Sequence, residues 1–308
     1  MSSGKKIIAV VGSTGLQGGS VVRSLLADGT FAVRALTRNA NGDAATKLKA
    51  AGAEVVSADL EDVESLKKAF RGAYGVFGVT VFALYVGVEK FDQAKSRDHE
   101  TQLGKNIVDA AEAEGTKHLV WSTLDDTSRD GGVHVYHFVV LDKHIQTKKV
   151  PTTFLFTSPY FNNITKFGWL KKEGDTINVN VPLPYDVPVP FYEATATGEW
   201  VKNIFKNPDE WIGKRADAYG GSNTAVEIAE ALKKKTAKNV VLNKVTHEQF
   251  NSKEFHDALG DELWLNNKYI VDGGLVRDAE LSKRANPNGS NLEQFVERDE
   301  AIKAFLSS

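Results

Sequence analysis

A glycine-rich turn near the N-terminus, between an apolar run and a helical pattern, constrains the fold more than any other feature. Residues 7–11 are continuously apolar, as in a parallel strand that is covered on both faces. Gly12, Gly15 and Gly18 follow directly, and residues 21–26 then carry apolar side chains at helical spacing. A strand, a Gly-x-x-Gly-x-x-Gly turn and a helix, in this order, predict a loop that binds the phosphates of a dinucleotide.

Each glycine of this loop has its own physical reason. Gly12 permits the tight turn, Gly15 lets a pyrophosphate approach the backbone, and Gly18 lets the helix pack against the strand. The amides at the helix N-terminus face the phosphates, where the helix dipole favours negative charge. The expected cofactor contacts of the loop are Gly12, Ser13, Thr14, Gly15, Leu16, Gln17 and Gly18. The alternative is an ordinary turn between a strand and a helix.

Strands and helical patterns alternate through the first half of the chain. Apolar runs that predict further strands lie at 31–36, 54–56, 75–79, 118–121 and 153–156. This alternation predicts an α/β fold with a Rossmann-type, doubly wound parallel sheet. The pattern breaks after Pro159. We therefore expect a Rossmann domain at 1–156 and a smaller α+β lobe at 157–308, over the strand ends where ligands of such sheets bind.

The composition narrows the class of protein. A content of 42% hydrophobic and 25% charged residues is ordinary for a globular chain. The net charge of −2 gives no field that would attract nucleic acid or an anionic membrane. The chain has no cysteine, which excludes disulfides and thiol catalysis, and no apolar run long enough for a signal peptide or a membrane span. We expect a soluble protein of the cytoplasm, with the nucleus left open.

The second predicted strand distinguishes between the two nicotinamide cofactors. An NAD site usually places an acidic residue about 20 positions beyond the loop, where it accepts from the ribose 2′-hydroxyl. This chain has Arg38 and Asn39 there, and the next acid is Asp43. A guanidinium can form a forked contact with a 2′-phosphate, so we expect NADP(H) to bind at least about tenfold more tightly than NAD(H). The alternative is a solvated surface arginine.

Further candidate contacts follow the third and fourth predicted strands. Asp59 and Leu60 end the third strand, a natural position for contacts with the adenine, and Thr80 follows the fourth strand beneath the central part of the cofactor. The next loop is unusually apolar and includes Phe82 and Tyr85. These two residues line either a cleft for a substrate or a partner, or the hydrophobic core.

Several segments resemble the NmrA-like family, an atypical branch of the short-chain dehydrogenase/reductase superfamily. Residues 10–19 resemble its nucleotide loop, and 34–39 its second strand with the basic contact to the 2′-phosphate. Similar segments also lie at 100–106, 109–111, 121–124, 150–153, 160–163 and 291–296. The resemblance implies NADP(H) binding and places Tyr160, Phe161 and Asn163 on the nicotinamide side.

The catalytic pair of conventional short-chain dehydrogenases is absent. None of the eight tyrosines has a lysine four positions later, so the usual proton donor is missing. Lys143 resembles the helix lysine of isoflavone-reductase-like relatives, and Ser122 stands where related enzymes hold a hydroxyl near the substrate. The simpler explanation for Lys143 is a solvated lysine on a helix, and Ser122 lacks the tyrosine partner of those enzymes. Histidines and an aspartate between 134 and 144 do not have the spacing of a zinc site, so we expect no metal.

The resemblance implies two kinds of function. One is an NADP(H)-responsive regulator that acts through a protein partner, and the intact loop without a proton donor favours it. The other is an NADPH-dependent reductase of an apolar quinone- or enone-type acceptor, with Phe82, Tyr85, Tyr160 and Phe161 lining its cleft. Direct contact with nucleic acid or a membrane is expected in neither case, and the oligomeric state stays open.

Overall fold

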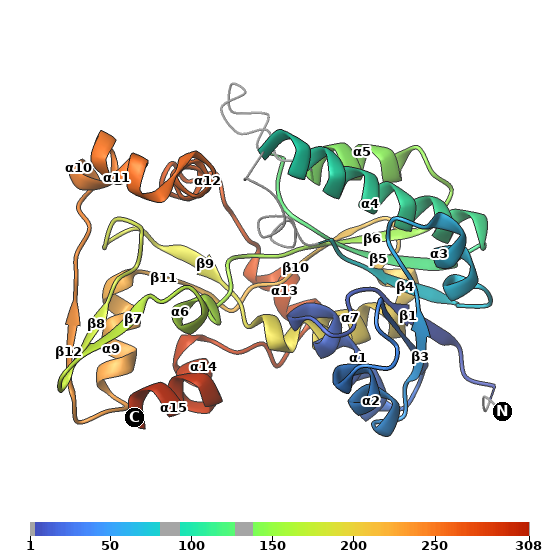
Figure 1. The fold of residues 1–308 in the computed structure, drawn as a ribbon, viewed down its shortest axis with the longest axis horizontal. Coiled ribbons are helices and arrows are strands. Elements are labelled where there is room, and N and C mark those ends of the chain that lie inside the picture. The colour runs from blue at the N-terminus through green and yellow to red at the C-terminus, as the bar shows by residue number, and fades with distance from the viewer. Residues whose placement is uncertain (1–3, 81–92, 127–137, 308) are drawn as a thin grey trace.

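The computed structural model describes residues 4–80, 93–126 and 138–307. One of its two lobes is built on a sheet of seven parallel strands in the order β10-β6-β5-β4-β1-β2-β3 (Figure 1). The strands are β1 (Ile7–Val10), β2 (Ala32–Thr37), β3 (Glu54–Ser57), β4 (Gly75–Gly78), β5 (His118–Thr123), β6 (Thr152–Phe156) and β10 (Arg215–Asp217). The predicted Rossmann-type sheet is confirmed. The strand order reverses between β1 and β4, and the carboxyl ends beside such a reversal are where these sheets bind ligands.

Helices cover both faces of the sheet, as the continuous apolar strands require. Ile8 and Val10 pack beneath α1 and α7, whereas Ala9 and Val11 pack beneath α3, α4 and α5. Successive residues of one strand therefore bury their side chains on opposite faces. These helices are α1 (Leu16–Asp28), α2 (Asp43–Ala50), α3 (Val63–Phe70), α4 (Gln93–Ala113), α5 (Phe138–Gln146) and α7 (Thr197–Lys206).

Two elements from beyond residue 156 belong to the lobe that contains the seven-stranded sheet. β10 pairs with β6 and forms one edge, and α7 packs against α1. The two helices lie so close that a Cβ on Gly198 would be 2.3 Å from the carbonyl oxygen of Ser20. The expected boundary after residue 156 therefore does not separate the two lobes along the chain, because residues 157–308 contribute to both.

The second lobe has its own core beside the sheet (Figure 1). It holds a three-stranded sheet of β7 (Leu170–Glu173), β8 (Thr176–Val179) and β12 (Asn239–Leu242), and a two-stranded one of β9 (Val189–Phe191) and β11 (Gly221–Asn223). The remaining helices are α6 (Asn163–Lys166), η3 (Ala194–Ala196), α8 (Pro208–Trp211), α9 (Ala225–Lys233), α10 (His247–Phe250), α11 (Lys253–Leu259), α12 (Asp261–Val271), α13 (Ala279–Ala285), α14 (Leu292–Arg298) and α15 (Glu300–Ser307). None of the helices in the described ranges combines the length and the hydropathy that a membrane crossing requires.

Candidate functional site

The glycine loop joins β1 to α1 with the close approach that its sequence predicts. Gly12 has a φ of +63°, a backbone conformation that side chains other than glycine rarely adopt. The amide of Gly15 donates to the carbonyl of Gly12 over 2.9 Å, which closes the turn. A Cβ on Gly18 would lie 2.2 Å from the oxygen of Gly12, so only glycine lets α1 approach the strand end this closely.

The N-terminus of α1 is open to an anion. Gly15 is the N-cap residue and forms no side-chain cap, and the first turn of a helix has no intrahelical acceptors for its amides. Gly12, Thr14 and Gly15 are exposed, so this backbone is accessible, and Leu16 is half-buried. Ser13 is buried, and its hydroxyl donates to the carbonyl of Leu36 over 2.7 Å. The Ser13 hydroxyl therefore holds the loop against β2.

Arg38 lies at the same edge of the sheet as this loop. The register pairs Val10 of β1 with Ala35 of β2. Ser13 and Arg38 each lie three residues further on, so they follow the ends of these two neighbouring strands. Arg38 is exposed and forms no hydrogen bond or ion pair within the described ranges. Arg34 differs, because it pairs with Glu54 at 2.8 Å. The guanidinium of Arg38 is thus available to a ligand.

The next two strand ends carry the candidates for the adenine side. Asn39 shapes the turn after β2 and accepts from the amide of residue 41 over 3.2 Å. Asp59 is exposed after β3, and the carbonyl of Leu60 accepts from the side chain of Asn106 over 2.8 Å. Asn106, on α4, was not predicted as a site residue. Thr80 follows β4 and is buried. Asn39, Asp59, Leu60 and Thr80 thus follow the carboxyl ends of their strands.

A chain of hydrogen bonds connects the glycine loop to the ends of β5 and β6. The hydroxyl of Ser122 donates to the side-chain oxygen of Gln17 over 2.8 Å. The side-chain amide of Gln17 donates to the hydroxyl of Tyr160, also over 2.8 Å. Burial raises the pKa of Tyr160 above its ordinary value. The structure therefore brings three predicted residues together into one polar cluster.

The other candidates after β6 lie apart from this cluster. The ring of Phe161 is fully buried in the second lobe and stacks between Phe191 and Phe295, with centroid distances of 5.4 and 5.3 Å. That ring therefore packs in a core, which differs from the expected cleft lining. Asn163 is half-buried at the start of α6.

Helix α5 presents a different residue to the site from the one expected. Lys143 is exposed, whereas its neighbour Asp142 accepts a 3.0 Å hydrogen bond from the hydroxyl of Thr123, at the end of β5. Burial, as the largest cause, raises the pKa of Asp142 to about 7, and the nearby Asp125 and Asp126 add to the effect. Asp142 was not predicted as a site residue. The feature of the sequence that could have indicated it is an acidic residue directly after the apolar residues 138–141.

Two candidates cannot be placed, because Phe82 and Tyr85 lie outside the described residues. Within the described ranges, no group of three or more metal-ligating side chains occurs. His144, from the cluster noted in the sequence, pairs instead with Asp109 at 2.8 Å.

The sequence matches the NmrA-like family over residues 4–296. The NmrA-like family domain-containing oxidoreductase cpsB of Aspergillus campestris is 32% identical over 265 residues, or 78% of this chain and 75% of that protein. Another NmrA-like family domain-containing oxidoreductase, FrzB of a Cladobotryum species, is 47% identical over 120 residues, which are 38% of this chain and 33% of that protein.

Solved structures share the fold over nearly the whole chain. NmrA, a negative transcriptional regulator, matches in its complex with NADP with a TM-score of 0.77 at 22% identity, covering 98% of this chain and 97% of that chain. Its complex with NAD gives a TM-score of 0.78 at 21% identity, with the same coverage. The triphenylmethane reductase of a Citrobacter species, complexed with NADP(H), gives 0.69 at 19% identity, covering 97% and 99%.

Proposed function

This chain belongs to the NmrA-like family, and from that premise we propose that it binds NADP(H) and uses it as a reductase of an apolar acceptor. The observation that carries the cofactor binding is the open N-terminus of α1 at the same sheet edge as the guanidinium of Arg38, which has no partner among the described residues.

The residues of this edge suit the pyrophosphate and the 2′-phosphate of the cofactor. The amides of the first turn of α1 donate to the pyrophosphate, and the close packing at Gly18 holds that turn against β1. Arg38 donates to the 2′-phosphate through charge-assisted hydrogen bonds, each worth about 1.5–3 kcal/mol. NAD(H) lacks that phosphate, so Arg38 favours NADP(H). The NmrA complexes with both cofactors are a reason to measure this preference directly.

Calorimetry with cofactor-stripped protein tests the binding proposal. We expect heat of association with NADP⁺ and at least about tenfold weaker binding of NAD⁺. Equal affinities would remove the proposed role of Arg38. If neither nucleotide gave any heat, the proposal would fail as a whole.

Two observations favour the reductase over the regulator. The relative at 32% identity is named an oxidoreductase, and the hydroxyls of Ser122 and Tyr160 lie together at the ends of β5 and β6. Bound NADPH supplies a hydride, and an activated acceptor such as a quinone needs little help from a general acid. The missing Tyr-x-x-x-Lys pair is therefore compatible with this reaction. In the family the Tyr160 segment is on the nicotinamide side, so we place Ser122, Gln17 and Tyr160 beside the reacting ring.

A panel of quinones, enones and triarylmethane dyes tests the reaction, with the loss of NADPH absorbance as the readout. We expect oxidation of NADPH with at least one acceptor. No oxidation at saturating concentrations across the panel would exclude the proposed reductase for these acceptor classes.

The similarity in fold to NmrA supports a regulator as the second candidate. Such a protein would bind a partner with an affinity that depends on cofactor occupancy, because a ligand shifts an equilibrium only when it distinguishes the two states. Capture of partners by the immobilised chain, with and without NADP(H), tests this function. Partner binding that NADP(H) does not change would exclude it.

A further inference from the structure

A fully buried guanidinium lies where the second lobe meets the sheet. Arg277 belongs to the connection between α12 and α13, and its side chain is 0% exposed. Arginine is almost never fully buried unless its charge is paired, because removing the charge from water is costly. The partners of Arg277 therefore show what this part of the fold holds in place.

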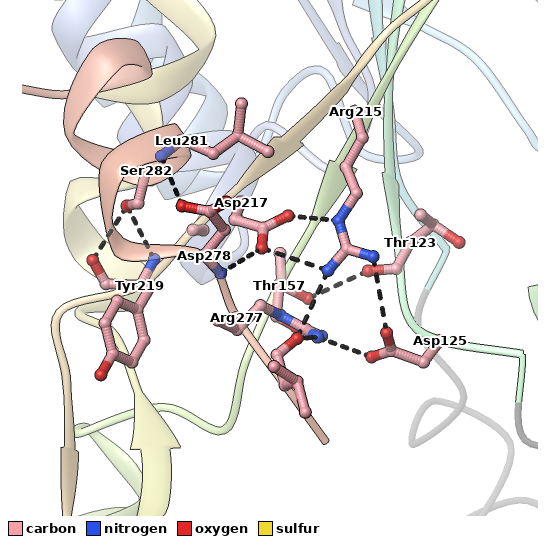
Figure 2. A network of polar contacts seen from close by, with 12 residues as sticks. Thr123, Asp125, Thr157, Arg215, Asp217, Tyr219, Arg277, Asp278, Leu281 and Ser282 are labelled. Atoms are coloured by element: carbon pink, nitrogen blue, oxygen red, sulfur yellow. Dashed lines mark hydrogen bonds and ion pairs between the residues drawn. The ribbon is translucent and has the colours of Figure 1, made fainter. Parts of the chain in front are cut away.

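Arg277 contacts the ends of two neighbouring strands at once (Figure 2). It forms a 2.7 Å ion pair with Asp125, which lies two residues beyond β5. Its Nε donates to the carbonyl of Thr157, the first residue after β6, over 3.0 Å, and its Nη2 donates to the same oxygen. A further hydrogen bond of 2.8 Å reaches the carbonyl of Val276.

These two strand ends carry the polar cluster of the candidate site. Thr157 donates its amide to the carbonyl of Thr123 over 3.0 Å, so the chains remain paired beyond the sheet. Ser122 is the residue before Thr123, and it pairs in register with Leu155 of β6. Tyr160 lies three residues beyond Thr157. The position of Arg277 therefore bears directly on where the hydroxyls of Ser122 and Tyr160 lie.

A second buried group fixes the connection that carries Arg277. Asp217 of β10 is 0% exposed and accepts from the amide of Asp278 over 2.8 Å (Figure 2). Asp217 also accepts two hydrogen bonds from Arg215, at 2.5 and 3.1 Å. Arg215 lies over the ring of Phe156 at 4.1 Å and has an Nη1 atom 3.9 Å from the carboxylate of Asp125. The connection is thus anchored to β5, β6 and β10 together.

We propose that Arg277 is a positioning residue for the nicotinamide side of the cleft, because it holds the ends of β5 and β6 at the spacing that Ser122 and Tyr160 require. The proposal rests on the cofactor binding proposed above. Lysine cannot replace arginine here, since its single ammonium lacks the planar fork that reaches Asp125 and the Thr157 carbonyl together. Substitution of Arg277 leaves the carboxylate of Asp125 incompletely paired beside the ends of β5 and β6, and these strand ends then move apart.

The test separates the nicotinamide end of the cofactor from its phosphate end. Calorimetry measures the affinity of wild type and of Arg277→Lys for NADP⁺ and for 2′-phospho-ADP-ribose, which is the same nucleotide without its nicotinamide. We expect Arg277→Lys to lose about tenfold in affinity for NADP⁺ and less than about twofold for 2′-phospho-ADP-ribose. A merely structural loss would lower both affinities equally.

Two further variants keep the test interpretable. Asp125→Asn removes the partner charge with little change in shape, and it should change the same ratio of affinities even if Arg277→Lys does not fold. Arg284→Lys is the matched control, because Arg284 lies on the adjacent α13 and pairs at the surface with Glu210, with side chains 59% and 39% exposed. It should leave both affinities unchanged.

The outcomes are distinct. If wild type binds NADP⁺ and both site variants keep its ratio of affinities, Arg277 has no positioning role. An equal loss for both nucleotides contradicts the proposal in the same way. If wild type binds neither nucleotide, the proposed cofactor binding fails, and the role of Arg277 fails with it.

Discussion

The hydroxyl of Ser122 lies 2.8 Å from the side-chain oxygen of Gln17, although the two residues are 105 positions apart in the chain. Gln17 belongs to the glycine loop, yet its side chain is directed to the strand ends at Ser122 and Tyr160. The loop therefore serves two parts of the site, the phosphates through its backbone and the nicotinamide side through this one side chain.

Gln17→Glu should weaken NADP⁺ binding with little effect on folding. The new carboxylate still accepts from Ser122, and the Tyr160 hydroxyl, which accepts from Gln17 in wild type, can turn to donate to it. Negative charge is also favourable in the first turn of a helix. It also repels the pyrophosphate, so we expect about a tenfold loss of affinity for NADP⁺ by calorimetry. Gln294→Glu, in the first turn of α14, is the control. Unchanged affinity of Gln17→Glu would place the pyrophosphate elsewhere.

Arg38→Ala should change cofactor preference alone. The side chain is exposed and has no partner in the described ranges, so the free energy of unfolding should stay within about 0.5 kcal/mol of wild type. We expect at least about tenfold weaker binding of NADP⁺ and unchanged binding of NAD⁺. Arg71→Ala is the control for loss of an exposed arginine away from the site: Arg71 lies between α3 and the amino end of β4, is 72% exposed and pairs with Glu114 at 3.6 Å. A preference that survives Arg38→Ala would show that another group recognises the phosphate.

Gly18→Ala should destabilise the protein by about 2–3 kcal/mol, because its Cβ would lie 2.2 Å from the oxygen of Gly12 and force α1 away from β1. Gly19→Ala is the comparison. Its Cβ would lie 3.3 Å from the oxygen of Ser13, and alanine is the better helix former, so we expect a change within about 1 kcal/mol. Urea unfolding measures both variants. Equal stabilities would mean that the close approach at Gly18 is not needed.

His118 makes the stability of the protein depend on pH. Burial lowers the pKa of His118 from 6.5 to about 4, so the unfolded chain binds an extra proton between these values. Stability contributed by the neutral ring is complete above pH 6.5 and is lost as the pH falls to 4, by on the order of 3 kcal/mol. Over this range, urea unfolding should give wild type a slope of stability against pH that is more positive than that of His118→Leu, by about 1.4 kcal/mol per pH unit. Parallel slopes would contradict the assignment.

Asp142 has the opposite effect. Its pKa is raised from 3.8 to about 7, so the folded state keeps a proton that the unfolded state releases. Its contribution to stability is present below pH 3.8 and is lost as the pH rises to about 7. Asp142→Asn still accepts from Thr123 and cannot ionise. At pH 8 this variant should be more stable than wild type by on the order of 2–4 kcal/mol. Urea unfolding at pH 8 measures this difference, and a variant less stable than wild type would contradict the raised pKa of Asp142.

Local patterns predicted the parts of the fold that are formed by adjacent residues. The turn at Gly12–Gly18 and the arginine after β2 depend on short segments, so sequence alone placed them at one sheet edge. β10 was not predicted, because Arg215–Asp217 has three residues and no apolar run. α7 reads as an ordinary amphipathic helix, and nothing in its sequence specifies that it packs on α1.

The polar cluster and the arginine network depend on contacts between distant residues. Gln17 and Tyr160 are 143 positions apart, and Arg277 and Thr157 are 120 apart. Both pairs depend on the alignment of the ends of β5 and β6 in the sheet. Sequence reasoning therefore selected Ser122, Gln17 and Tyr160 for separate reasons, without their mutual hydrogen bonds, and it did not select Arg277 or Asp142.

The late return of the chain to the sheet has a consequence for dissecting the molecule. A fragment that stops at residue 156 would lack β10 and α7, leaving β6 as an unprotected edge and the apolar face of α1 in water. The complementary fragment would carry β10 with no strand to pair with. Neither half should fold on its own. Recombination with relatives should therefore keep η3, α7, β10 and α13 with the N-terminal parent, because these elements pack on α1, on the sheet or on one another.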